Sequence, residues 1–313
     1  MIFNDDKISV SIVIPVYNAE FSIGKLVDEL VSELNHHYNL EIVLVNDNSQ
    51  DNSEEICIGL YEKYKNVVSF YSLSKNVGEH NAVMAGLNNV SGEYVVIMHD
   101  DFQNPISEVI KLISYASGNI YDVVYTYYKK KKHSYLRNLG SWFNDKIANY
   151  MLNKPKNLYL SSFKIINEHI VQEIIKYDLP FPYIDGLILR TTDNLGKIEV
   201  KHSERKRGKS GYTLKKLISL WSNMFTNFSI LPLRISIIIG FIFAIIGFLY
   251  GIQSIIEKLL NPDIPIGYPS IIVLIVIFSG VQLMAIGMIG EYLGRVFLSQ
   301  NKKPQYTIRK IFK

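Results

Sequence analysis

The stretch Tyr94-Val-Val-Ile-Met-His-Asp-Asp-Phe-Gln-Asn-Pro105 decides the fold. An apolar, largely β-branched run stops at two carboxylates, a carboxamide and a proline, which predicts a buried strand that ends in a polar loop. Open α/β sheets bind their ligands at the carboxyl ends of the strands. Asp100, Asp101 and Gln103 offer hard oxygen ligands, which suit a divalent cation. The alternative is an acidic loop that only caps a helix beginning near Pro105.

The flanking sequence alternates between strands and helices. Strands are predicted at residues 8–14, 41–45, 67–73, 94–98 and 122–126, and helices at 19–34, after Asp51 or Ser53, and at 78–87. This alternation indicates an α/β fold with a doubly wound, mostly parallel sheet. The sequence contains no G-x-G-x-x-G and no P-loop motif, so a dinucleotide fold of the usual kind is not supported.

Two long segments near the C-terminal end lack charge. No charged residue occurs from Ile235 to Ile256 or from Ile264 to Gly290. Because about 20 apolar residues are enough to cross a bilayer, a membrane hairpin with spans at about 234–256 and 267–290 is predicted. The alternative is a helical pair buried in a soluble core.

The charges around these segments predict an orientation. Basic residues precede the first segment and follow the second, whereas the connector carries Lys258 against Glu257 and Asp263. By the positive-inside rule, both termini and the main domain of a multi-pass plasma (inner) membrane protein then face the cytoplasm. The start of the chain has no signal-peptide pattern, and the single Cys57 fits a reducing compartment. The net charge of +4 fits a membrane surface better than nucleic acid.

Thr213 to Leu231 has its apolar residues on one helical face, which predicts a helix lying in the membrane interface. A helix packed in a domain core is the alternative. The resulting organisation is a main domain at 1–212, the interfacial helix at 213–231, the hairpin at 232–294 and a basic tail at 295–313. Gly247 with Gly251 and Gly290 with Gly294 have the spacing of close helix contacts, which leaves a homo-oligomer open.

Four polar clusters follow predicted strands, at residues 15–20, 46–49, 75–78 and 99–103. Because the carboxyl ends of parallel strands share one edge, these clusters are expected to meet there. Each cluster alone is a weak signal, since Asp47 or Asn76 could merely close a turn through side-chain hydrogen bonds. Together they predict a nucleotide pocket with an aromatic ring, carboxylates for the nucleoside and a metal site for the diphosphate.

The same segments resemble a known family. Val13-Ile-Pro-Val-Tyr-Asn-Ala-Glu20, Val45-Asn-Asp-Asn-Ser-Gln-Asp-Asn-Ser53, Leu73-Ser-Lys-Asn-Val-Gly78 and Asp100-Asp-Phe-Gln-Asn-Pro105 look like motifs of family 2 glycosyltransferases, and more narrowly of the polyprenyl-phosphate type. The resemblance continues through 161–166, 202–212, 231–234 and 290–295, and so covers nearly the whole chain. It implies a membrane-anchored, inverting transferase that moves a sugar from a nucleotide donor to undecaprenyl phosphate. The product would serve cell-envelope glycan biosynthesis, such as cell wall biogenesis.

The resemblance also implies roles for individual residues. The donor-binding residues are Pro15, Tyr17, Glu20, Asp47, Asn76, Gly78, His99 and Asp100. The metal ligands for Mg²⁺ or Mn²⁺ are Asp101 and Gln103, with Asp100 as a further candidate, and Asp101 also counts as catalytic. The acceptor phosphate is assigned to Arg205, Lys209 and Ser210. Lys164 replaces the arginine usual in the family, and Asp185 either orients a substrate or forms a structural hydrogen bond; with Arg205 they complete the catalytic set.

The chain departs from the family pattern at three positions, where His99, Asn46 and Asn167 replace residues that are usually aspartate. At the first of them, Asp100 could substitute as a ligand, or His99 could contact the nucleotide and leave Asp101 as the only carboxylate ligand. A histidine ligand would favour manganese over magnesium.

The chemistry of the acceptor supports this interpretation. A lipid monophosphate has a second pKa near ~6, so it is largely a dianion in the cytosol and a competent nucleophile. The enzyme must then bring two anions together, with a cation at the leaving group and basic residues at the lipid phosphate. Residues 205–209 are candidates for the second role, although a basic cluster can also be attracted simply to anionic lipid. Lys129 to Lys132 are predicted to form a mobile active-site loop.

Two other functions stay open from the sequence. One is a transferase that acts on a carbohydrate hydroxyl, which should carry a strong catalytic carboxylate and more membrane spans. The other is a non-catalytic membrane protein that binds a nucleotide sugar. Transfer of label to a lipid acceptor would distinguish the three.

Overall fold

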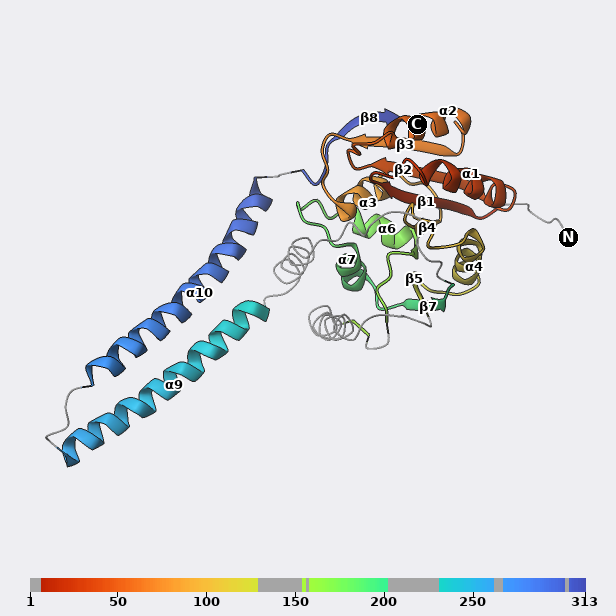
Figure 1. The fold of residues 1–313 in the computed structure, drawn as a ribbon. Helices are drawn as coiled ribbons and strands as arrows, with labels where there is room; N and C mark the ends of the chain where they lie inside the picture. The colour runs from red at the N-terminus through yellow and green to blue at the C-terminus, as the bar shows by residue number, and fades with distance from the viewer. Residues whose placement is uncertain (1–6, 129–153, 156–157, 202–230, 262–266, 302–303) are drawn as a thin grey trace. The chain divides into compact units, whose positions relative to one another are not determined.

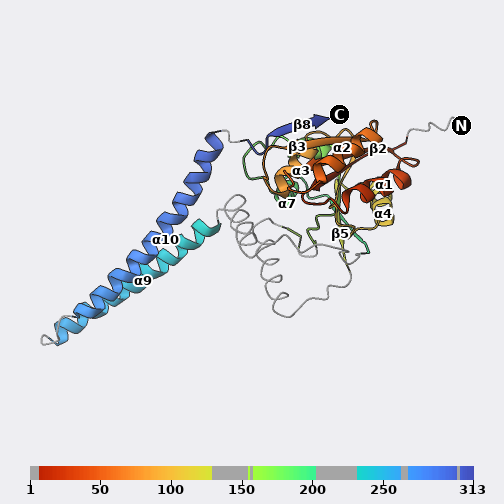
Figure 2. The same cartoon turned by 45° about the horizontal axis from the view of Figure 1, so that its top comes forward.

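The computed structural model describes residues 7–128, 154–155, 158–201, 231–261, 267–301 and 304–313. The chain divides into two compact units, which are drawn as ribbons in Figures 1 and 2. The first unit is Met1–Thr213 together with Lys303–Lys313, and the second is Leu214–Lys302. Each unit is described by itself.

The first unit is built on an eight-stranded sheet with the order β7-β5-β6-β4-β1-β2-β3-β8. The strands are β1 (Ser9–Val16), β2 (Asn39–Asn46), β3 (Val68–Leu73), β4 (Tyr94–Ile97), β5 (Val123–Tyr127), β6 (Lys164–Asn167), β7 (Leu195–Glu199) and β8 (Ile308–Phe312). Strands β3, β2, β1 and β4 are parallel neighbours. Strand β6 runs antiparallel to β4 and β5, and β8 runs antiparallel to β3. The predicted mostly parallel α/β sheet is confirmed, and so are the five predicted strands.

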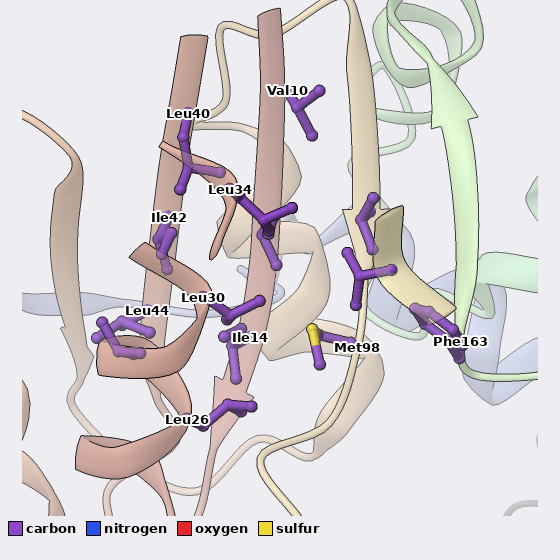
Figure 3. Close-up of a cluster of buried hydrophobic side chains, with 14 of the residues drawn as sticks. Val10, Ile14, Leu26, Leu30, Leu34, Leu40, Ile42, Leu44, Met98 and Phe163 are labelled. Atoms are coloured by element: carbon purple, nitrogen blue, oxygen red, sulfur yellow. The ribbon is translucent and has the colours of Figure 1, made fainter. Parts of the chain in front are cut away.

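Helices cover both faces of this sheet. They are α1 (Ile23–Leu34), α2 (Ser53–Lys63), α3 (Glu79–Leu87), α4 (Ile106–Ser117), α6 (Glu168–Ile174) and α7 (Ile184–Thr191). On one face, Leu26, Leu30 and Leu34 of α1 gather with side chains of β1 and β2 in the apolar core shown in Figure 3. Burial on both faces explains why these strands read as continuous apolar runs.

The opposite face of β1 and β2 is covered by α3 at very short range. A Cβ atom at Gly86 would clash with the side chain of Val13 and lie 3.4 Å from that of Val45. Only glycine therefore lets α3 approach the sheet this closely. Gly78, directly before the helix, has a φ of 89°, a conformation that side-chain-bearing residues rarely adopt.

Strand β8 was not predicted, because the sequence indicated only a basic tail after the second apolar segment. The ring of Phe312 packs against the rings of Tyr61 and Phe70, with centroids 5.6 Å and 5.8 Å away. The backbone N–H of Ser74 donates to the carbonyl oxygen of Thr307 at 2.8 Å. The C-terminal residues thus extend the sheet of the first unit beyond β3.

The described part of the second unit consists of two long helices, α9 (Leu231–Leu260) and α10 (Tyr268–Gln300). Both are long and apolar enough to cross a membrane, with the most apolar windows at Ser236–Gln253 and Phe278–Leu298. Both helices extend beyond the spans expected at 234–256 and 267–290. Phe278 of α10 meets Phe243 of α9 edge to face at 6.3 Å between ring centroids. Apart from Leu231, the expected interfacial helix lies outside the described residues.

Candidate functional site

The candidate site is the edge of the sheet where β1, β2, β3 and β4 end. Because these strands are parallel neighbours, the loops that follow them emerge at the same edge. All four polar clusters predicted from the sequence therefore lie there.

The loops after β1 and β2 are joined by hydrogen bonds. The backbone N–H of Asn18 donates to Ser49 Oγ at 3.0 Å, and the N–H of Gln50 donates to Asn18 Oδ1 at 2.9 Å. Asn18 and Asn48 both have positive φ, at 53° and 55°, which asparagine tolerates better than most residues. Tyr17 is 46% exposed beside this junction, so its ring is accessible to a ligand.

Glu20 belongs to the same junction. Its Oε2 accepts a hydrogen bond from the backbone N–H of Asn52 at 3.1 Å, and its own N–H donates to Asp51 Oδ2 at 3.1 Å. Pro15 lies in β1 beside Val45 of β2. Glu20, predicted to hold the nucleoside, thus braces the first loop against the start of α2.

Asp47 connects the loop after β2 to the loop after β3. Its two carboxylate oxygens accept hydrogen bonds from the backbone N–H groups of Val77, at 2.7 Å, and Gly78, at 2.9 Å. Asn76 Nδ2 donates to the carbonyl oxygen of Asp47 at 3.3 Å. Asp47, Asn76 and Gly78 therefore come together as predicted donor-site residues. They also close the loops through side-chain hydrogen bonds, which the sequence left open as the alternative.

The acidic loop follows β4. Asp101 Oδ1 accepts a hydrogen bond from the backbone N–H of Gln103 at 3.1 Å, and Phe102 between them has a φ of 57°. Asp100, Asp101 and Gln103 are all partly exposed at the end of the strand. Within the described ranges, no group of three or more His, Cys, Asp or Glu side chains could hold a metal ion by itself. Two carboxylates and a carboxamide do fit a Mg²⁺ or Mn²⁺ ion whose remaining ligands come from a diphosphate.

His99 pairs with Glu79, which the sequence reasoning missed. His99 Nε2 lies 2.9 Å from Glu79 Oε1 at the start of α3. Burial lowers the pKa of His99, but Glu79, and then Asp101 and Asp100, outweigh it and raise the pKa to about 9. The structure therefore makes His99 a partner of Glu79 beside the acidic loop.

A buried ion pair lies on the other side of β4. Lys164 Nζ contacts Asp185 Oδ1, and Tyr125 donates its hydroxyl hydrogen to the same oxygen at 2.9 Å. In the sheet, Lys164 lies between Ile97 of β4 and Tyr125 of β5, so the pair is close to the acidic loop. Burial and the nearby Asp185 carboxylate raise the pKa of Tyr125, which keeps its hydroxyl protonated as a donor.

The three departures from the family pattern share one feature, which is that each non-acidic side chain faces a carboxylate of this chain. His99 pairs with Glu79 as described. Asn46 Nδ2 donates to Glu54 Oε2 at 3.1 Å, and Asn167 Nδ2 donates to Asp122 Oδ1 at 3.0 Å. An aspartate at any of the three positions would place two carboxylates within hydrogen-bonding distance.

Several predicted residues lie outside the described part of the chain. These are Arg205, Lys209, Ser210 and the lysines at 129–132. Their roles stay predictions.

A mostly parallel sheet with an acidic loop at the carboxyl end of a central strand is the arrangement expected of a nucleotide-sugar transferase. The family model "Glycosyl transferase family 2" matches residues 11–175. The chain belongs to this family and is a glycosyltransferase, as the sequence motifs indicated.

Curated relatives match along almost the entire chain. The undecaprenyl-phosphate 4-deoxy-4-formamido-L-arabinose transferase of Photorhabdus laumondii subsp. laumondii is 32% identical over 311 residues, which cover 96% of this chain and 94% of the relative. The transferase of the same name from Proteus mirabilis is 31% identical, with 96% and 93% covered.

Solved structures agree on the fold. Glucosyl-3-phosphoglycerate synthase from Mycobacterium tuberculosis, crystallised with Mn²⁺, uridine diphosphate and phosphoglyceric acid, aligns with a TM-score of 0.50 and 16% identity. The alignment covers 69% of this chain and 78% of that one. At this identity the likeness supports the fold of the first unit alone.

Proposed function

We propose that this protein transfers a sugar from a nucleotide donor to undecaprenyl phosphate at a membrane surface. The observation that carries the proposal is the similarity over 96% of the chain to relatives named for that acceptor. The match spans the sheet as well as the two membrane-length helices, so the similarity extends beyond residues 11–175 that the family model matches.

The donor is assigned to the edge where β1 to β4 end. Pro15 and Tyr17 would contact the nucleobase, and the loops ordered by Asp47 and Glu20 would enclose the ribose. Asp101 and Gln103, with Asp100, would hold Mg²⁺ or Mn²⁺ against the diphosphate. When bound, the cation would neutralise the charge that develops on the departing nucleoside diphosphate.

The transfer step needs one displacement. A phosphate oxygen of the acceptor forms a bond to the anomeric carbon while the bond from that carbon to the donor's β-phosphate oxygen breaks. The nucleoside diphosphate leaves with the electron pair, and the configuration inverts. A phosphate dianion needs no general base, so the Lys164–Asp185 pair is assigned to orienting the donor sugar, and Arg205, Lys209 and Ser210 to receiving the acceptor phosphate.

The proposed membrane arrangement rests on the charges that flank the two apolar segments, and it suits a lipid acceptor. The catalytic domain at 1–212 and both termini are assigned to the cytoplasmic side of the plasma (inner) membrane. The helix at 213–231 is assigned to the interface, and the spans at 234–256 and 267–290 to the bilayer. The product would enter cell-envelope glycan biosynthesis. A reporter within 261–267 should prove extracytoplasmic and one at Lys313 cytoplasmic; the reverse would contradict this arrangement.

The activity is tested with the full-length chain in detergent or nanodiscs. Labelled nucleotide sugars are supplied with undecaprenyl phosphate, beginning with the 4-deoxy-4-formamido-L-arabinose donor that the relatives' names suggest. Label should appear in the organic phase and be lost in Asp101→Ala and with a chelator. Nucleotide binding without turnover of any donor would contradict the proposal and favour a non-catalytic binding protein.

A further inference from the structure

Glu54, the second residue of α2, connects three strands of the sheet through its carboxylate. It accepts hydrogen bonds from Asn46 of β2 at 3.1 Å and from Ser72 of β3 at 2.8 Å. From β8, Arg309 Nη2 donates to Glu54 Oε2 at 2.6 Å and Lys310 Nζ donates to Oε1 at 2.8 Å. The Glu54 side chain is only 17% exposed, whereas the Arg309 and Lys310 side chains that reach it from β8 are 47% and 46% exposed.

Asn46 links Glu54 to the turn at residues 46–49, which contains the predicted donor-site residue Asp47. Its Oδ1 accepts a hydrogen bond from the backbone N–H of Ser49 at 3.0 Å while its Nδ2 donates to Glu54. Both the oxygen and the nitrogen of the Asn46 side-chain amide are therefore hydrogen-bonded, and Asn46 is fully buried. The turn from Asn46 to Ser49 contains Asp47, which holds the next loop through Val77 and Gly78.

Strand β8 supplies the positive charge that this network requires. Burial raises the pKa of Glu54, but Lys310, Ser72 and Arg309 more than offset it, and the net shift is downward. Without Arg309 and Lys310, the partly buried carboxylate of Glu54 would keep only the neutral hydrogen-bond donors Asn46 and Ser72.

We propose that β8 is a positioning element of the donor site. Arg309 and Lys310 fix Glu54, Glu54 fixes Asn46, and Asn46 fixes the turn that carries Asp47. The C-terminal residues would thus be needed for donor binding, although β8 pairs with β3 and not with β2, the strand that leads into this turn. The inference rests on the proposed function only in taking this turn as part of the nucleotide site.

A purely structural role for β8 predicts something different. Strand β8 also covers the edge of β3, and an uncovered edge lowers stability or solubility without favouring one substrate. A positioning role instead predicts weaker donor binding with unchanged use of the lipid acceptor.

The experiment uses the full-length chain in nanodiscs and four probes, UDP, GDP, CDP and dTDP, each titrated by calorimetry with Mn²⁺. For the nucleotide that binds tightest, Arg309→Ala/Lys310→Ala should raise the Kd about tenfold, as expected when charge-assisted hydrogen bonds are lost. The KM for undecaprenyl phosphate should stay unchanged. The conservative variant Arg309→Lys/Lys310→Arg should retain the wild-type Kd, and so should the control Lys63→Ala on the same helix as Glu54.

An exchange of side chains sharpens the test. Asn46→Asp should weaken nucleotide binding, because a second carboxylate then faces Glu54. Adding Glu54→Gln should restore much of it, because the amide and the carboxylate have exchanged places. Hydrogen exchange of a peptide covering residues 46–53 should be faster in Arg309→Ala/Lys310→Ala than in the wild type without any nucleotide.

The outcomes separate the inference from the proposed function. An unchanged Kd and unchanged hydrogen exchange in Arg309→Ala/Lys310→Ala, with loss of binding in Asp47→Ala, would overturn the inference and leave the function standing. Equal losses for donor and acceptor with a lower Tm would also overturn it, in favour of edge protection. A wild-type protein that binds none of the four nucleotides would overturn both.

Discussion

The two halves of the sheet are built in different ways. The parallel half, β3-β2-β1-β4, is made of largely apolar strands with helices on both faces, and the loops that carry its predicted donor-site residues begin where the strands end. The half formed by β6, β5 and β7 carries a buried ion pair, in which Lys164 of β6 contacts Asp185 of α7. All four strands of the first half are predicted by local sequence patterns, whereas in the second half only β5 is, and β6 and β7 are defined by contacts between residues far apart in the chain.

The largest effect is expected where the second half depends on its ion pair. Lys164→Met removes the only cation that contacts Asp185 among the described residues, and leaves a buried carboxylate with Tyr125. Breaking a buried pair on one side costs about 3–5 kcal/mol of unfolding free energy. Urea unfolding of the catalytic unit within the full chain measures this loss.

The double variant Lys164→Met/Asp185→Leu is the matched control. It should recover most of the stability while transfer stays impaired, because both charges are gone. Stability unchanged in Lys164→Met alone would show that the second half does not depend on this contact.

The parallel half should behave in the opposite way at its strand ends. Asp101→Asn removes a charge from a partly exposed loop, so the unfolding free energy should hardly change. Transfer should fall about 10²–10³-fold, the usual cost of losing one electrostatic contact to a transition state. Single-turnover rates of sugar transfer, measured across a Mn²⁺ titration, test this prediction. If Asp101→Asn transferred sugar at the wild-type rate, the acidic loop would have no role in the transfer step.

Packing within the parallel half can be tested at Gly86. Gly86→Ala places a methyl group against Val13, and overpacking of this kind costs about 1–3 kcal/mol. Gly59→Ala is the matched control, because a Cβ there meets nothing within 4 Å. Equal Tm values for the two variants would contradict the close approach of α3 to the sheet.

The smallest effect is a pH dependence at the junction with β8. The folded state lowers the pKa of Glu54 below its ordinary value, so this carboxylate stabilises the fold above its unfolded pKa. That stabilisation is lost as the pH falls through the folded pKa. The difference in unfolding free energy between wild type and Glu54→Gln should therefore shrink on acidification, and a difference that stays constant from pH 7 to the acid limit would contradict the assignment.

The same contrast explains what the sequence could predict. The five strands and the four polar strand ends were predicted, because apolar runs and their abrupt ends are local signals. Strands β6, β7 and β8 were missed, since their sequences carry weak patterns and their places in the sheet are defined by distant partners. Glu79 and Glu54 were missed for a related reason. Each lies in the first turn of a helix, where an acidic residue is expected for the helix dipole alone.

The three positions where aspartate is replaced show what a resemblance to a family can identify from sequence and what it cannot. The sequence identified His99, Asn46 and Asn167 as departures, but their compensating partners Glu79, Glu54 and Asp122 lie 8 to 45 residues away along the chain. Only the folded sheet brings these pairs together. At each of the three positions the non-acidic side chain contacts a carboxylate of this chain, which is consistent with an intact site.

The measurement that tests the central claim most directly compares two acceptors. The full-length protein is given its labelled nucleotide sugar with either undecaprenyl phosphate or undecaprenol. The account predicts organic-phase product with the phosphate and none with the alcohol, because the phosphate dianion attacks without a general base. Product formed with undecaprenol, or label transferred only to a carbohydrate, would contradict it.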